Sequence, residues 1–178
     1  KPKEEWQENL MLIVERGLGH LGVELSEFNS ALNPFTESFD WNAEEVVRAK
    51  IPAANGQFTA RSLARMYAML ANGGELDGVR VLSEERVREL SQVQSKARDR
   101  VLFIPMHWRM GYHKAFTVGV RAPEAFGHYG YGGSGAFCDP GRNLAVALTL
   151  NSGAGTPMGN SNMPKIARAA IRSVDRLR

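Results

Sequence analysis

The residues best suited to chemistry lie in one glycine-rich segment, FGHYGYGGSGAFCDP, at positions 126–140. It holds His128, Ser134 and Asp139 among five glycines and several apolar side chains. A histidine with its ordinary pKa of about 6.5 can accept or donate a proton near neutral pH. Glycine within a strand commonly marks the close approach of another main chain or of a ligand. A phosphate, a neighbouring strand and a substrate carbonyl are therefore the candidates for what lies against this backbone.

Two familiar kinds of site, a dinucleotide-binding loop and a serine nucleophile elbow, do not fit this sequence context. Three of the glycines fit the dinucleotide pattern G-x-G-x-x-G (Gly130, Gly132 and Gly135), but that pattern must open a helix, and Asp139-Pro140-Gly141 breaks the chain here instead. Ser134 lacks the G-x-S-x-G nucleophile elbow, since an alanine replaces the last glycine. If the segment is one strand, Ser134 and His128 lie about 20 Å apart and cannot share a proton.

A glycine-rich edge strand whose amides face a ligand accounts for the histidine, the glycines and the apolar surroundings together. Exposed N–H groups on such an edge can pair with a peptide-like substrate. They can also stabilise the oxyanion of an acyl-transfer intermediate. His128, at the start of the strand, would supply a hydrogen-bond donor or a titratable group beside them.

The first half of the chain predicts helices. Apolar spacing predicts one at residues 3–18, and Asn42 is expected to cap a short one that carries Glu44 and Glu45 in its first turn. The clearest helix starts after Thr59 and ends at Gly73 or Gly74. Its expected buried face is Leu63, Met66, Tyr67 and Leu70, and a turn at Asp77-Gly78 and a helix capped by Ser83 follow.

The second half predicts strands. Three β-rich segments, 107–116, 125–140 and 144–152, precede a closing helix near Pro164, and the last two segments fit an antiparallel hairpin. The expected inner stripe of the closing helix is Ile166, Ala170, Val174 and Leu177. The order indicates an α+β fold, with a three-stranded antiparallel sheet flanked by helices. We expect one domain over 1–178, with a helical segment at 1–98 and the strands and closing helix at 101–178.

Composition narrows the function classes. A chain of 178 residues with 43% hydrophobic residues can bury one core. Its 22 basic and 19 acidic residues are too balanced to indicate a nucleic-acid partner. The single cysteine, Cys138, cannot form an internal disulfide, and His20, His107 and His113 are not spaced as metal ligands. No apolar run reaches the length of a membrane span, and no targeting segment indicates a compartment.

The segment GHYGYGGSGAFCDPGRNLAVALTLN resembles the last motif and following hairpin of the serine β-lactamase and penicillin-binding-protein-like hydrolases, especially class C β-lactamase-related esterases and peptidases. That family carries K-T-G or H-x-G at this place, matched here by His128-Tyr129-Gly130. The resemblance covers about residues 50–155. It implies that His128 contacts a substrate carboxylate or assists proton transfer, that the Tyr131 amide is an oxyanion donor, and that Tyr129, Gly130 and Gly132 bind a small acyl substrate without a cofactor.

The family's Ser-x-x-Lys nucleophile motif and its Tyr-x-Asn motif are missing from this sequence. In the family, these motifs precede the segment matched here. We therefore expect this chain to be the C-terminal part of a larger hydrolase, completed by an N-terminal half in the same or another polypeptide. Alone it should be inert and should leave one apolar face of its sheet bare. The alternative is a non-catalytic binding or scaffold domain that kept the hydrolase fold.

Overall fold

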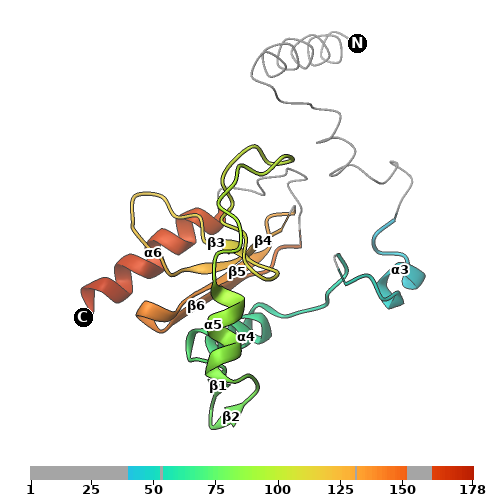
Figure 1. Ribbon diagram of the computed structural model, residues 1–178. Helices are drawn as coiled ribbons and strands as arrows, with labels where there is room; N and C mark the ends of the chain where they lie inside the picture. The colour runs from blue at the N-terminus through green and yellow to red at the C-terminus, as the bar shows by residue number, and fades with distance from the viewer. Residues whose placement is uncertain (1–39, 53, 131, 152–161) are drawn as a thin grey trace, which may run out of the picture. The chain divides into compact units, whose positions relative to one another are not determined.

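The computed structural model describes residues 40–52, 54–130, 132–151 and 162–178. The helix predicted at residues 3–18 lies outside these ranges. The chain divides into two compact units, residues 1–50 with 98–105 and residues 51–97 with 106–178. The glycine-rich segment belongs to the second unit, which also holds the sheet and the longer described helices (Figure 1).

In the first unit, the described residues include a short helix, α3 (Glu44–Arg48). The acidic residues of its first turn were predicted correctly, but the predicted cap at Asn42 was wrong. Asn42 does not cap the helix, since it precedes the N-cap residue Ala43, and its own amide hydrogen is accepted by the Asp40 carboxylate at 2.8 Å. The helix then begins after Ala43 without a side-chain cap.

The ends of helix α4 (Ala60–Ala71) follow the prediction. Thr59 Oγ1 accepts the Ser62 amide hydrogen at 3.1 Å, and Ser62 Oγ accepts that of Thr59 at 3.1 Å, which completes a capping box. Gly73 and Gly74 follow with φ of 67° and 96°, a left-handed conformation that favours glycine. Local side-chain chemistry therefore fixes both ends of this helix.

The buried face of α4 is rotated from the predicted one. Tyr67 and Leu70 are buried as expected, together with Met69 and Ala71. Met66 is 39% exposed, so its prediction as a core residue was wrong. The helix turns Tyr67, Leu70 and Ala71 toward the sheet, and this leaves Met66 at the solvent side.

A hairpin and a further helix follow α4. Strands β1 (Glu75–Leu76) and β2 (Val79–Arg80) are joined through Asp77 and Gly78, whose φ values of 51° and 76° match the turn that two-residue hairpins favour. Ser83 then caps α5 (Glu84–Ser91) by accepting the Arg86 amide hydrogen at 3.1 Å. Both features confirm the prediction.

The main sheet is antiparallel, in the order β3 (His113–Lys114), β4 (Phe126–Tyr129), β5 (Gly135–Asp139) and β6 (Leu144–Leu148). The α+β prediction is confirmed, but the segment 125–140 is a hairpin of two strands rather than one, so four strands replace the expected three. β4 also lies inside the sheet, between β3 and β5. Its prediction as an edge strand was therefore wrong.

A neighbouring strand explains two of the crowded glycines. A Cβ atom at Gly127 would lie 2.0 Å from the carbonyl oxygen of Ala136, and one at Gly135 would lie 2.8 Å from that of His128. Both separations are impossible for real side chains, so β4 and β5 can approach this closely only with glycine at these positions. Of the three candidates for a close neighbour of this backbone, the one found at Gly127 and Gly135 is a neighbouring strand.

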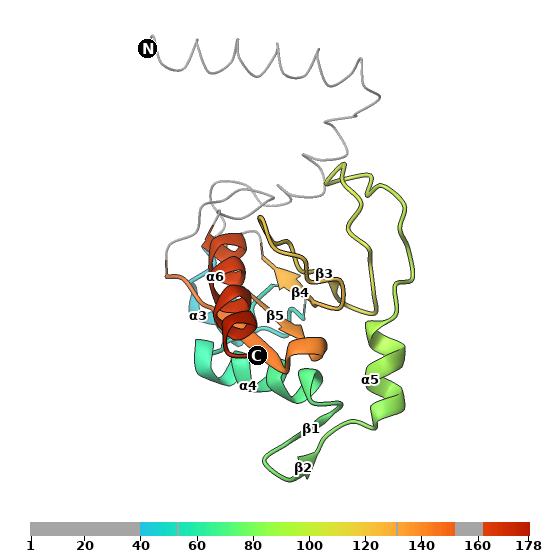
Figure 2. The same ribbon diagram turned by 90° about the vertical axis from the view of Figure 1, so that its left-hand side faces the viewer.

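Both faces of the sheet are covered by helices (Figure 2). On one face, Phe126, Ala136 and Cys138 pack with α4. On the other, Ala125 and Phe137 pack with α6 (Asn162–Arg176). Strand alternation therefore buries consecutive residues of one strand in two separate clusters. The expectation of a bare apolar face was wrong for these strands.

Helix α6 contacts the sheet through Met163, Ala167 and Ile171, a stripe that is rotated from the predicted one. Leu177 is 88% exposed, because α6 ends at Arg176 and the chain leaves the helix there. The predicted residues Ile166, Ala170 and Val174 are only half-buried and flank the true stripe.

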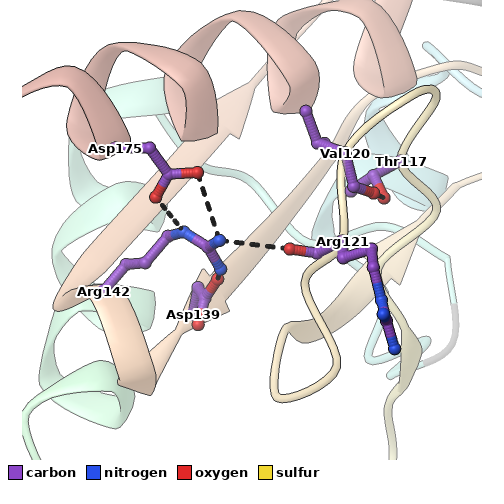
Figure 3. Close-up of polar contacts among 6 residues, drawn as sticks. All are labelled: Thr117, Val120, Arg121, Asp139, Arg142 and Asp175. Carbon is purple, nitrogen blue, oxygen red and sulfur yellow. Dashed lines mark hydrogen bonds and ion pairs between the residues drawn. The ribbon is translucent and has the colours of Figure 1, made fainter.

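Arg142 ties α6 to the turn between β5 and β6 (Figure 3). Its Nε and Nη2 donate to the two carboxylate oxygens of Asp175 on α6 at 2.7 and 3.2 Å. Its Nη1 donates to Asp139 Oδ2 at 2.7 Å, and Nη2 also donates to the Arg121 carbonyl at 3.1 Å. The side chain of Asp139 is only 1% exposed, so Arg142 neutralises a buried carboxylate.

We expect Arg142→Met to lower the free energy of unfolding by about 3 kcal/mol, since it leaves the buried Asp139 carboxylate without its cation. Urea unfolding followed by circular dichroism measures this. Asp175→Asn is the matched control: it weakens only the exposed side of the network, and its effect should be much smaller. Equal effects of the two substitutions would contradict this account.

Candidate functional site

The motif His128-Tyr129-Gly130 occupies the end of β4, where the strand enters its hairpin turn. Gly132 is half-buried within that turn. Tyr131, the predicted oxyanion donor, lies outside the described residues. The structure therefore places four of the five predicted site residues together at one end of the sheet.

His128 is exposed to solvent although it belongs to an interior strand. Its ring lies 5.2 Å from that of His113, measured between centroids. Desolvation by the surrounding protein lowers the pKa of His128 below its usual value. The side chain is thus solvent-accessible and uncharged at neutral pH, which suits an acceptor of protons or hydrogen bonds.

Tyr129 faces the opposite side of the sheet. Its ring packs with the cluster beneath α6, and its hydroxyl donates to the Phe116 carbonyl at 3.3 Å. Burial raises the pKa of the Tyr129 hydroxyl, which therefore stays protonated. With the ring occupied in this way and the amide hydrogen accepted by His113, a role of Tyr129 in substrate binding would fall to its main-chain carbonyl.

Gly130 has both of its main-chain groups occupied by the turn. Its amide donates to the Ser134 carbonyl at 2.7 Å, and its own carbonyl accepts the Gly133 amide hydrogen at 2.9 Å. Gly133 has a φ of 89°, which the turn requires and glycine permits. The Gly130 amide is therefore not available to an oxyanion.

Ser134 lies nearer to His128 than a single extended strand would allow. His128 is paired with Ala136, so Ser134 is its diagonal neighbour across the hairpin, and such neighbours are about 7–8 Å apart. The predicted separation of about 20 Å was wrong, because the segment folds back on itself. Ser134 Oγ accepts the Leu150 amide hydrogen at 2.9 Å, which gives this hydroxyl a structural partner.

The residue that sequence reasoning undervalued is His113, which is 1% exposed. Its Nε2 accepts the Tyr129 amide hydrogen at 2.9 Å, and its Nδ1 lies 2.7 Å from the Lys114 carbonyl. These partners assign a neutral imidazole with its hydrogen on Nδ1. Burial lowers the pKa of His113 to about 4; the Lys114 carbonyl opposes this shift, and electrostatic interactions with His128 and Arg109 add to it. Only the strand register, which the sequence does not reveal, would have pointed to this role.

Other reactive groups nearby are inactive or absent from the described part of the chain. Cys138 is fully buried, and burial raises the pKa of its thiol to about 12, so it is not a nucleophile. Among the residues that the structure describes, no three His, Cys, Asp or Glu side chains are arranged to hold a metal ion. None of the described helices is long and apolar enough to cross a bilayer.

Known proteins have similar sequences and folds. Residues 12–171 match the model of the Beta-lactamase family. The protein named esterase/beta-lactamase LipL from Mycobacterium tuberculosis (strain ATCC 25618 / H37Rv) is 48% identical over 104 residues, which make up 58% of this chain and 24% of LipL.

Two solved structures are similar as well. A penicillin-binding protein homologue from Caulobacter crescentus has a TM-score of 0.72 and 33% identity over 82% of this chain and 40% of its own. A family VIII carboxylesterase has a TM-score of 0.65 and 30% identity over 74% of this chain and 36% of its own. The chain therefore spans about a quarter of the curated relative and less than half of either solved structure.

The buried His113 predicts an acid-sensitive fold. As pH falls from 6.5 toward 4, the unfolded chain gains a proton at this residue and the folded chain does not, so the free energy of unfolding should fall. The loss is on the order of 3 kcal/mol relative to His113→Gln, which cannot titrate. Urea unfolding at several pH values measures both proteins. Parallel stability curves over this range would show that His113 titrates normally.

Proposed function

This chain belongs to the beta-lactamase family, and on that premise we propose that it forms the H-x-G part of a serine hydrolase that acts through an acyl-enzyme. The observation that carries the proposal is the exposed imidazole of His128 at the end of β4, in the matched motif His128-Tyr129-Gly130. The four-stranded sheet carries that end, with helices packed on both of its faces. Precise support of this kind is what a reacting group requires.

The charge state of His128 favours one of the two roles that the resemblance implies. A histidine with a lowered pKa is neutral at pH 7, so it pairs weakly with a substrate carboxylate. The same neutral ring can accept a proton from an attacking hydroxyl and return it to a leaving group. We therefore assign proton transfer to His128.

Esters are the first substrate class that we propose, since LipL is named an esterase/beta-lactamase and the family VIII enzyme a carboxylesterase. β-Lactams and D-amino-acid peptides remain further acyl substrates of the proposed chemistry. We assign the Tyr131 amide as one oxyanion donor, because the neighbouring Gly130 amide is occupied by the turn. Gly132 would leave room for the acyl group in this turn.

The nucleophile must come from residues other than these 178, since no serine here is followed by a lysine three positions later. A Ser-x-x-Lys segment in the same or another polypeptide would supply it, together with the second oxyanion donor. The present chain alone would then form no acyl-enzyme. The domain proposed for residues 1–178 is accordingly the C-terminal part of one hydrolase domain.

The missing nucleophile also favours a second function, that of a non-catalytic binding or scaffold domain. A domain of this kind would keep the fold and an acyl-binding surface without turnover. The two functions differ in whether a Ser-x-x-Lys segment accompanies these residues in the active protein. Ester binding without hydrolysis by the native gene product would identify the second.

We expect the native gene product that contains these residues to hydrolyse p-nitrophenyl esters, and we expect His128→Ala to lower kcat/KM by about 10²- to 10⁴-fold because it removes a proton-transfer group. His107→Asn is the matched control, since it removes a histidine outside the motif at a φ of 51° that asparagine tolerates. The 178-residue chain should be inactive. Unchanged turnover by the His128 variant would sink the assignment, and turnover by the chain alone would show that it holds its own nucleophile.

A further inference from the structure

The pairing between β3 and β4 ends at Gly127, one residue before His128. His113 pairs with Gly127 and Lys114 with Phe126, and extension of this register would set Gly111 opposite Tyr129. Gly111 has a φ of 79°, which is incompatible with an extended strand. The chain therefore turns away where the Tyr129 amide needs an acceptor, and the imidazole of His113 fills that place at 2.9 Å.

We propose that His113 is a positioning residue, whose neutral ring replaces the missing strand carbonyl and fixes the course of β4 from His128 to Gly130. Its catalytic consequence rests on the proposed function, while the positioning itself does not. A buried amide without an acceptor is costly, so β4 would otherwise shift or open at Tyr129. Such a shift would move His128, the adjacent residue.

The hydrogen bonds of His113 exclude a direct part in proton transfer. Nδ1 donates to the Lys114 carbonyl, and Nε2 accepts from Tyr129. Exchange of a proton with His128, whose ring centroid is 5.2 Å away, would break one of these main-chain bonds. His113 therefore acts through the geometry of β4.

The surroundings of His113 keep it neutral. Arg109 is the cationic side chain whose electrostatic interaction lowers the pKa of His113, and the His128 ring faces His113 from β4. Lys114 meets the ring through its main-chain carbonyl. Trp108, Phe116 and Tyr129 enclose the ring, with centroids 5.2 to 5.9 Å away. A second proton would sit on Nε2 and oppose the Tyr129 N–H, donor against donor, so protonation would release the strand end.

Amide hydrogen exchange at Tyr129, measured by NMR in the native gene product, tests the positioning. His113→Gln retains a carbonyl acceptor, and His113→Leu removes it at similar volume. We expect Tyr129 to exchange at least tenfold faster in the Leu variant and within a few-fold of wild type in the Gln variant, with the Phe137 amide protected in all three. Equal Tyr129 exchange in wild type and the Leu variant would overturn the proposal.

If the Leu variant fails to fold, ¹⁵N spectra of the wild-type imidazole decide instead. A hydrogen on Nδ1 and an unprotonated, accepting Nε2 at neutral pH support the proposal, and a hydrogen on Nε2 overturns it.

In ester hydrolysis, the His113→Leu variant should lose at least tenfold in kcat with little change in KM, and the His113→Gln variant should keep most of the wild-type kcat. Normal kcat in a folded Leu variant would refute the positioning role. Absence of hydrolysis in wild type would count against the proposed function alone.

Discussion

The hydrogen bond from the Tyr129 amide to the buried His113 imidazole is the interaction on which the geometry of the site depends. β4 is an interior strand, and each of its buried amides needs an acceptor. On one side β5 supplies them, up to the turn at Gly130. On the other side, the chain that leads into β3 turns at Gly111, and the His113 side chain accepts the Tyr129 amide hydrogen instead. The exposed His128 therefore lies on a strand end whose amide at Tyr129 is bonded to His113 and whose amide at Gly130 is bonded to the Ser134 carbonyl.

Within the second unit, helices α4 and α6 pack on the two faces of the sheet that contains this strand. Alternation along β4 and β5 sends successive side chains into two clusters, one beneath α4 and one beneath α6. Arg142 joins α6 to the turn after β5 by bonds to Asp139 and Asp175, as Figure 3 shows. The chain thus places a solvent-exposed histidine on a scaffold whose faces are both packed, an arrangement suited to chemistry at the strand end.

Local chemistry made part of this structure predictable. Thr59, Ser83 and the glycines after α4 signal helix ends through their own side chains or backbone, and Asp77-Gly78 signals its hairpin in the same way. The hairpin within 126–140 was missed although Gly132-Gly133 lies in its turn, because all five glycines of the segment were interpreted as places of close approach along one strand. Met66 and Leu177 were misplaced because the exposed face of a helix depends on what packs against it. His128 was proposed from its place in the glycine-rich segment and from a family resemblance, whereas the proposed role of His113 depends on register and on a turn at Gly111.

These features support one chemical account, in which the end of β4 lies beside an acyl substrate and His128 transfers a proton from the attacking hydroxyl to the leaving group. The most direct test is a crystal structure of the native gene product after reaction with an ester-like phosphonate that traps a serine nucleophile. The account predicts a phosphonyl oxygen within hydrogen-bond distance of the Tyr131 amide, with the His128 ring facing the leaving-group side. An adduct remote from β4, or a Tyr131 amide bonded to another part of the protein, would contradict it.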